Sequence, residues 1–207
     1  LAHAIEYTGR ISEGINFLEK TQNHWQQCDT LAPHINWHWA LYELEQDNWE
    51  KAEEILQNCY LNNNEVELTR LKYTDAASLI YRLKLAGHPC PSQLNTRLKQ
   101  FLDNHLHDHQ TLFSDFHHYF VLDNFADTVA KKDFLRSLKE TVESSDTDIG
   151  KSYREIGPYI FVALERFDEG EYAQAVELLY PIRNRTAIAG GSNAQRDIFN
   201  FHRLFRK

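Results

Sequence analysis

The sequence predicts an all-α fold, arranged as a tetratricopeptide-like array of antiparallel helical hairpins (an α-α superhelix) with roughly ten helices. Apolar residues recur at helical spacing through most of the 207 residues, and no stretch alternates as a β-strand would. Three helix breaks are also followed by the same pattern of residues. We therefore expect a single helical-repeat domain covering residues 1–207.

In the shared pattern, a bulky residue stands two positions after the break, a small residue three further on, and a leucine four after that. The three sets are Gly9/Ile11/Gly14/Leu18, Asp47/Trp49/Ala52/Leu56 and Gly170/Tyr172/Ala175/Leu179. In a tetratricopeptide-type hairpin, the small residue lets the second helix lie close against the first. Gly14 and Ala52 are 38 residues apart, near the expected period of about 34. The repeats between the second and third sets would be degenerate, and an ordinary α-helical bundle is the alternative.

The expected helices can be placed in order along the chain. In the first half they cover residues 2–8, 11–25, a histidine–tryptophan helix from Pro33 to the break at Asp47, 52–59, 71–85 and 94–106. In the second half they cover residues 111–122, 131–143, 159–167, 172–179 and a last helix from Ser192 to the C-terminus.

Local signals place several of these boundaries. Asn62–Asn64 and Ser144–Asp146 are expected to form polar turns. Gly157-Pro158 places the start of the helix over 159–167, because proline is favoured at the first position of a helix. Ser192-Asn193-Ala194-Gln195 has the pattern of a capping box, in which serine and glutamine side chains satisfy backbone N–H groups at the helix start.

The composition narrows the classes of partner and the compartment. The formal net charge of −8 argues against nucleic acid or an anionic membrane as partner. The longest apolar run, Tyr159 to Leu164, is too short to span a bilayer, and no signal peptide is visible. Cys28, Cys59 and Cys90 are far apart, which is typical of reduced thiols in a cytoplasmic protein rather than of disulfides or a zinc site.

The chain contains no methionine and opens on Leu1-Ala2-His3-Ala4-Ile5-Glu6, a segment typical of the middle of a helix. We therefore expect it to be the C-terminal part of a longer protein. In that case the N-terminal half of any site would lie outside this sequence.

Several stretches carry a resemblance that goes beyond a generic helical repeat. They are Ala2-His3, Gly9-Arg10, His34-x-x-Trp37-His38-Trp39-Ala40-Leu41, Asp75-x-x-Ser78-x-x-Tyr81-Arg82-Leu83, Asp108-His109-x-x-Leu112-Phe113-x-Asp115-x-His117, Pro181-Ile182-Arg183-x-Arg185 and Gly190-Gly191-Ser192-Asn193-Ala194-Gln195-Arg196-Asp197-x-Phe199. Taken in this order, they resemble the tetratricopeptide repeat protein 38 family, also called StaR-like proteins. The resemblance covers essentially the whole chain and corresponds to the C-terminal half of a typical member. It implies an all-helical repeat fold and a soluble intracellular protein, and it carries over no reaction.

The histidine–tryptophan helix holds the first candidate site. His34 and His38 are four residues apart, the spacing of two metal ligands on one helix turn. A third ligand could come from His3, His117 or Asp75. No glutamate follows His34, so the zinc-protease signature is absent. The alternatives are a non-metal polar role in a pocket and simple packing beside the tryptophans.

A second candidate site lies in the histidine-rich segment of the second half. A histidine held by a nearby carboxylate is the usual arrangement of a general base, and Asp115 and His117 are the candidates for it. His107 and His118 are expected at the surface. The alternative is that the whole segment is an ordinary histidine-rich helix junction.

Two further features could bind ligands. Gly190-Gly191-Ser192 at a helix start, with Arg196 one turn in, could hold a carboxylate or phosphate; a structural cap is the alternative. Trp37 and the neighbouring aromatic residues could line an apolar pocket or a flavin site, or could be core between repeats.

These observations support two functional hypotheses of different class. The first is a binding module whose concave face holds a peptide, a protein partner or a small molecule. The second is an enzyme with a cavity lined by histidine, aspartate and arginine, using acid–base or metal-assisted chemistry on a small molecule. The candidate catalytic residues are His38, His117 and Asp115, and the candidate ligand-binding residues are His3, His34, Trp37, Asp75 and Arg196. Whether a metal or a flavin is bound stays open.

Overall fold

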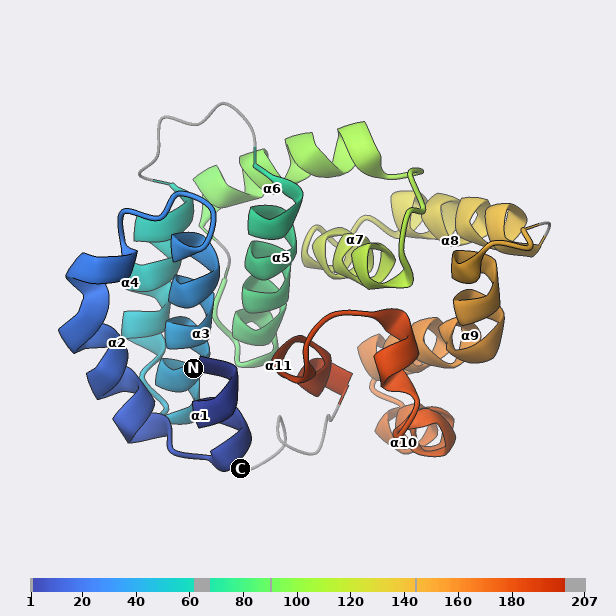
Figure 1. Cartoon of the computed structure of the whole chain (residues 1–207). Coiled ribbons are helices and arrows are strands. Elements are labelled where there is room, and N and C mark those ends of the chain that lie inside the picture. Colours follow the sequence, from blue (N-terminus) through green and yellow to red (C-terminus); the bar gives the residue numbers. More distant parts are fainter. Residues whose placement is uncertain (1, 62–67, 90, 144, 200–207) are drawn as a thin grey trace. The chain divides into compact units, whose positions relative to one another are not determined.

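The computed structural model describes residues 2–61, 68–89, 91–143 and 145–199 of the chain (Figure 1). These residues form eleven α-helices and three short 3₁₀ helices, and no β-strand occurs among them. The predicted all-α class is therefore confirmed. The predictions made for Asn62–Asn64, Cys90, Ser144 and the chain beyond residue 199 lie outside the described residues.

The chain divides into two compact units, Leu1–Asn104 and His105–Lys207. The first unit is built from α1 (Ala2–Thr8), α2 (Ile11–Trp25), α3 (Ala32–Glu45), α4 (Trp49–Tyr60), α5 (Arg70–Leu85) and α6 (Ser92–His105), whose last residue begins the second unit. The single helical-repeat domain expected from the sequence stays a prediction.

The second unit contains five α-helices and three single 3₁₀ turns among its described residues. They are α7 (Leu112–Asn124), α8 (Thr128–Glu143), α9 (Asp148–Asp168), α10 (Tyr172–Leu179), η1 (Tyr180–Ile182), η2 (Thr186–Ala189), α11 (Asn193–Arg196) and η3 (Asp197–Phe199). The predicted capping box is present at the start of α11, where Ser192 and Gln195 each bond the other's backbone N–H.

Helix α3 is the centre of the first unit. It packs against α1, α2, α4 and α5, and nine of its fourteen residues are buried. Trp37 and Trp39 point to different sides of the helix, and both are buried. A helix that is apolar on all sides is stable only when other helices surround it, so α3 needs the four neighbours that it has.

Among the described residues, five helices end with the same turn, in which one residue adopts the left-handed conformation. These residues are Gly9, Asp47, Gly87, Ala126 and Gly170, with φ between 51° and 89°. In each turn the N–H of this residue bonds the carbonyl three positions back, and the next N–H bonds the carbonyl five back. This is the Schellman arrangement. The three breaks that the sequence pattern singled out are therefore structurally equivalent.

Each of these three breaks is followed by the expected close contact at the small residue. Gly14, Ala52 and Ala175 are all buried. A Cβ atom on Gly14 would lie 2.7 Å from side-chain atoms of both Ile5 and Tyr42, so α2 can approach α1 and α3 only because this position has no side chain.

Helix α9 is longer than the sequence predicts. It begins at Asp148, and the Thr147 hydroxyl caps it by accepting the N–H of Gly150. Pro158 lies inside the helix, so the prediction of a helix start at Gly157-Pro158 was wrong. Proline removes one hydrogen bond and crowds the preceding turn, and in Figure 1 α9 changes direction part-way along its length.

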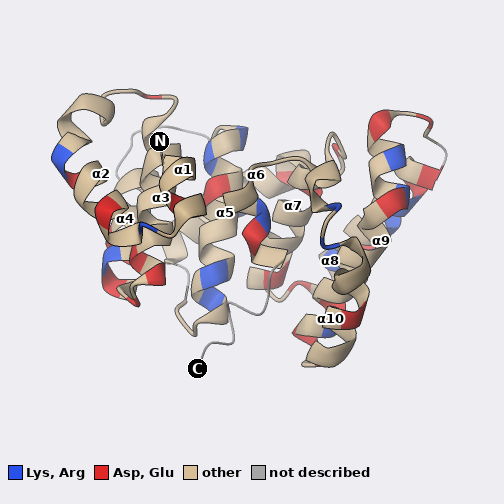
Figure 2. Ribbon diagram, turned by 60° about the horizontal axis from the view of Figure 1, so that its bottom comes forward, with Lys and Arg blue, Asp and Glu red and all other residues tan. Residues whose placement is uncertain are grey.

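Charged residues of both signs are mixed along the helices, as α4 and α9 show in Figure 2. Several form ion pairs one turn apart, such as Lys51 with Glu54 and Arg166 with Glu169. Among the described residues, no helix combines the length and the apolar character that a membrane crossing requires.

The left-handed turns predict a pair of opposite stability effects. Ala126 is exposed and holds φ 51°, which is unfavourable for a residue with a Cβ atom. We expect Ala126→Gly to raise the free energy of unfolding by about 1 kcal/mol, and Gly170→Ala, with open space around it, to lower it by a similar amount. Urea denaturation followed by circular dichroism measures both. A stability change of the same sign in the two variants would contradict the shared turn geometry.

A partly buried charge cluster makes the second unit sensitive to pH. The carboxylate of Asp168 accepts hydrogen bonds from Tyr119 Oη at 2.8 Å and Lys131 Nζ at 3.0 Å. Burial, together with the nearby charge of Asp123, raises the pKa of Asp168 from 3.8 to about 6. The folded protein therefore holds this proton more tightly than the unfolded chain does.

It follows that the free energy of unfolding should fall as the pH rises from about 4 to about 6. In this range the unfolded chain has already lost the proton of Asp168, whereas the folded state still holds it and has to release it. We expect Asp168→Asn to remove this part of the pH dependence, worth up to about 2 kcal/mol. Asp148→Asn is the control, because that carboxylate is fully exposed. Urea denaturation at pH 4, 5 and 6 gives the free energy of unfolding at each pH. If this free energy changes equally with pH in wild type and Asp168→Asn, the prediction is refuted.

Candidate metal-binding site

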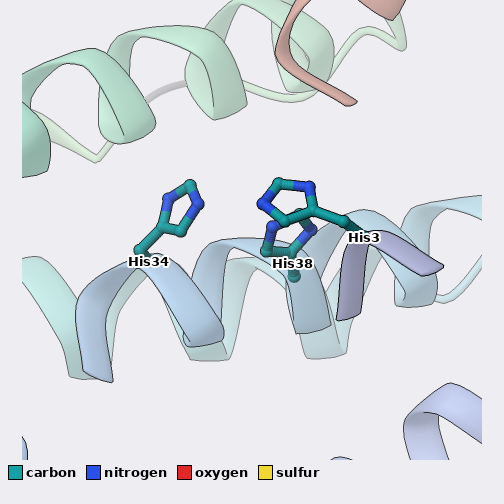
Figure 3. A group of neighbouring side chains, drawn as sticks. All are labelled: His3, His34 and His38. Atoms are coloured by element: carbon teal, nitrogen blue, oxygen red, sulfur yellow. The ribbon is translucent and has the colours of Figure 1, made fainter. Parts of the chain in front are cut away.

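Three histidines from two helices converge in the first unit. His34 and His38 lie on α3 and His3 lies on α1, and each offers one ring nitrogen within 4.8 Å of the other two. Figure 3 shows the rings of His34 and His38 on one side of α3, with His3 reaching in beside His38. The ring centroids of His3 and His38 are 4.4 Å apart, and those of His34 and His38 are 4.9 Å apart.

The local sequence explains how α3 presents two of these rings. Residues four apart lie on the same face of a helix, one turn above the other. Pro33 stands in the first turn of α3, where its missing N–H costs nothing. His34 therefore lies in the first turn of α3 and is half-buried. His38, one turn later, is buried, and His3 is exposed. The group runs from the interior to the surface.

Two carboxylates orient the two histidines of α3. Asp75 on α5 accepts a hydrogen bond from His34 Nδ1 at 2.9 Å, and Glu6 on α1 lies 3.2 Å from His38 Nδ1. With Nδ1 occupied in this way, Nε2 is the nitrogen left to act as a ligand in each ring. The buried Nε2 of His38 has no hydrogen-bond partner among the described residues. A histidine that donates Nδ1–H to a carboxylate and presents Nε2 is the usual state of a metal ligand.

Helix α1 is short, and a single side chain of α3 fixes its start. Tyr42 donates its hydroxyl hydrogen to the carbonyl of Ala2, with an O···O distance of 2.6 Å. Burial raises the pKa of Tyr42, so its hydroxyl stays protonated and able to donate. His3 immediately follows Ala2, so this hydrogen bond places His3 next to His38.

The electrostatic surroundings differ among the three rings. The hydrogen bond to Asp75 raises the pKa of His34. Partial desolvation lowers the pKa of His3, and the neighbouring His38 and His34 lower it further, because protonated rings this close would repel one another. Trp37 stacks on His34 with the ring planes 10° apart and also meets the edge of His38. Its role is therefore to support the two rings.

The donor set fits a transition metal. Imidazole nitrogens suit zinc, copper and nickel, and zinc binds them at about 2.0–2.1 Å in tetrahedral geometry. Nitrogens around such an ion are about 3.3 Å apart, so the present separations, all within 4.8 Å, would have to close by at most about 1.5 Å. The exposed His3 can make that movement by side-chain rotation.

The sequence predicted part of this site. The spacing of His34 and His38 indicated two ligands, and of the three residues considered for the third position, His3 is the one that joins them. Asp75 lies behind His34 instead, as its hydrogen-bond acceptor. Glu6 was missed; its only signal is its position three residues after His3, on the same face of a helix.

The residues predicted in the second half of the chain lie in the second compact unit. Asp115 is buried and accepts a hydrogen bond from His109 Nδ1 at 3.2 Å, a pairing that the sequence did not predict. His117 is buried and donates its Nδ1–H to the carbonyl of Phe113. His107 is exposed as expected, but His118 is buried, so the prediction of a surface position for His118 was wrong.

Arg196 is engaged with its own turn. Its guanidinium donates to the carbonyls of Gly190 and Gly191 and to the Asn193 side chain. Burial lowers its pKa. These contacts match the structural-cap alternative, because the guanidinium holds together the turn that precedes α11.

No family model matches the chain, and no solved structure matches it significantly. The resemblance to the tetratricopeptide repeat protein 38 family therefore stays a prediction.

The carboxylates that contact the Nδ1 atoms of the two α3 histidines predict that their removal weakens metal binding without abolishing it. We expect Glu6→Gln to weaken zinc binding by about 10–100-fold, the usual cost of losing an outer-shell partner. Glu53→Gln is the matched control, because Glu53 bonds His88 at 3.1 Å in the same unit, outside the three-histidine group. Competition titration against a chromophoric chelator measures both affinities. Equal affinities of Glu6→Gln and wild type would show that Glu6 does not orient His38.

Proposed function

We propose that this protein is a helical-repeat protein that binds a divalent transition metal, in the first instance zinc, through His3, His34 and His38. The observation that carries the proposal is the pair of carboxylate-held histidines one turn apart on α3, with a third histidine beside them. Buried polar atoms in proteins nearly always have a partner, and a metal ion would provide one for the buried Nε2 of His38.

Three histidine ligands leave one tetrahedral position for water or substrate. Structural zinc sites have four protein ligands, whereas catalytic sites have three and an open position. Zinc lowers the pKa of bound water to about 7 and so supplies hydroxide at neutral pH. This supports the enzyme hypothesis in one specific form, metal-assisted hydrolysis or hydration of a small molecule. The exposed His3 marks the side from which a substrate would enter.

The tetratricopeptide-like arrangement of the helices is part of the proposal. It is supported by the equivalent turns at Gly9, Asp47 and Gly170 and by the buried small residue that follows each of them. The resemblance to StaR-like proteins points in the same direction. A peptide or protein partner on a concave face stays a prediction.

Metal titration of single-histidine variants tests the function. We expect the metal-free protein to bind one zinc ion, and His3→Ala to lower the affinity by more than about 100-fold, since even an outer-shell loss costs 10–100-fold. His24→Ala is the matched control, because His24 is also an exposed helical histidine of the first unit. Isothermal titration calorimetry gives both affinity and stoichiometry.

The choice of His3 keeps the test independent of folding. His34→Ala would remove a hydrogen-bond partner of the buried Asp75 and could destabilise the unit, whereas the exposed His3 can be replaced at little cost. Circular dichroism of His3→Ala should match wild type. Wild-type affinity in this variant, or an equal loss in His24→Ala, would refute the three-histidine site.

A further inference from the structure

In the second compact unit, hydrogen bonds link the side chains of an aspartate, a histidine and a serine in series. His109 Nδ1 lies 3.2 Å from Asp115 Oδ1, and His109 Nε2 lies 3.0 Å from the Oγ of Ser137. His109 belongs to the segment before α7, Asp115 to the first turn of α7, and Ser137 to α8. His109 and Asp115 are buried, and Ser137 is half-buried.

The hydrogen-bond directions along this chain follow from the chemistry of the groups. An ionised carboxylate can only accept, so His109 must carry its proton on Nδ1 and donate it to Asp115. Nε2 is then an acceptor, and the Ser137 hydroxyl donates to it. This is the resting arrangement of a serine nucleophile, its general base and the carboxylate that fixes the tautomer of the base.

The backbone at His109 is held in an uncommon conformation. Its φ is 43°, in the left-handed region that residues other than glycine rarely adopt. The ring is fixed at both nitrogens and lies 5.5 Å from the ring of Phe134. A histidine with a strained backbone and a hydrogen bond at each ring nitrogen is oriented more firmly than one in a flexible loop. A general base requires such a fixed orientation.

We propose that Ser137 is an activated nucleophile that reacts with acyl or phosphoryl compounds bearing a good leaving group. Ser137 Oγ forms the new bond to carbon or phosphorus while its proton passes to His109 Nε2. The bond to the leaving group then breaks, and His109 returns the proton to that group. Asp115 stays ionised and stabilises the imidazolium as a positioning residue.

The surroundings of Ser137 indicate how fast turnover would be. Backbone N–H groups in the interior of α8 are used by the helix, so side chains must stabilise the oxyanion. Asp133, one turn before Ser137, holds His107 at 3.6 Å and also bonds Arg136. His107 and Arg136 are exposed and are engaged with Asp133, so neither replaces a backbone oxyanion hole. Hydrolysis of the adduct needs the same oxyanion stabilisation without the help of a good leaving group, so we expect the covalent serine product to accumulate.

A fluorophosphonate probe tests the proposal on the full chain. We expect Ser137 to be labelled, with peptide mass spectrometry locating the adduct, and labelling at this peptide to be lost in Ser137→Ala. His109→Asn should slow labelling by about 100-fold, in line with the usual contribution of a general base; asparagine is chosen because it tolerates left-handed φ. Ser152 is the matched control, a hydroxyl on α9 that bonds the carbonyl of Asp148.

Two substitutions of Asp115 separate a positioning role from a structural one. Without the carboxylate the imidazolium is less stable and the tautomer of His109 is no longer fixed, so Asp115→Asn should slow labelling of Ser137, and Asp115→Glu, which keeps a carboxylate, should restore part of the rate. Labelling of Ser137 no faster than that of Ser152, or an unchanged rate in His109→Asn, would overturn the proposal and assign the three residues to holding α8 against the segment before α7. Either result leaves the metal site untouched.

Discussion

The hydrogen bond between His34 and Asp75 is the constraint on which the candidate metal site depends. Asp75 is fully buried on α5, and a carboxylate in such a place is tolerated only when other groups satisfy its charge. The bond joins residues 41 positions apart in the sequence. It therefore sets the rotation of α3 against α5, and with it the direction in which His34 points.

The rest of the site follows from that orientation. Once His34 is fixed, His38 appears one turn later on the same face, where Glu6 can reach its Nδ1. The same helix places Tyr42 a further turn along, and the hydroxyl of Tyr42 anchors the start of α1. One buried helix thus provides two of the three histidines and the group that docks the third. Its packing on all sides is what keeps these distances short.

The two compact units use histidine–carboxylate pairs in different ways. In the first unit the carboxylates hold the Nδ1 atoms of His34 and His38, and the remaining nitrogens face other histidines, which suits a cation. In the second unit the free nitrogen of His109 faces a hydroxyl group, which suits proton transfer. The chemistry that each histidine–carboxylate pair can support therefore depends on the group that faces the other ring nitrogen, the one that does not contact the carboxylate.

Local features of both units could be predicted from the sequence. The expected helices over 2–8, 11–25 and 172–179 coincide with α1, α2 and α10, because apolar spacing and the glycine at each break act over a few residues. The i, i+4 spacing of His34 and His38 is equally local. The helix start predicted at Gly157-Pro158 was wrong because it relied on the preference of proline for the first position of a helix. The cap at Thr147 starts this helix earlier in the sequence.

Features that depend on how helices pack could not be predicted in this way. His118 is polar, yet α7 is buried on nearly every side, with eleven of its thirteen residues inside. The choice of His3 as third histidine, and the pairing of His109 with Ser137 across 28 positions, both depend on the rotation and register of separate helices. Sequence spacing within one helix carries no information about either.

X-ray absorption spectroscopy at the zinc edge of the zinc-loaded protein tests the three-histidine site. We expect one tightly bound ion with three imidazole nitrogens at about 2.0–2.1 Å and one further light-atom ligand. A sulfur ligand near 2.3 Å, a six-oxygen shell, or the absence of a tightly bound ion would contradict it.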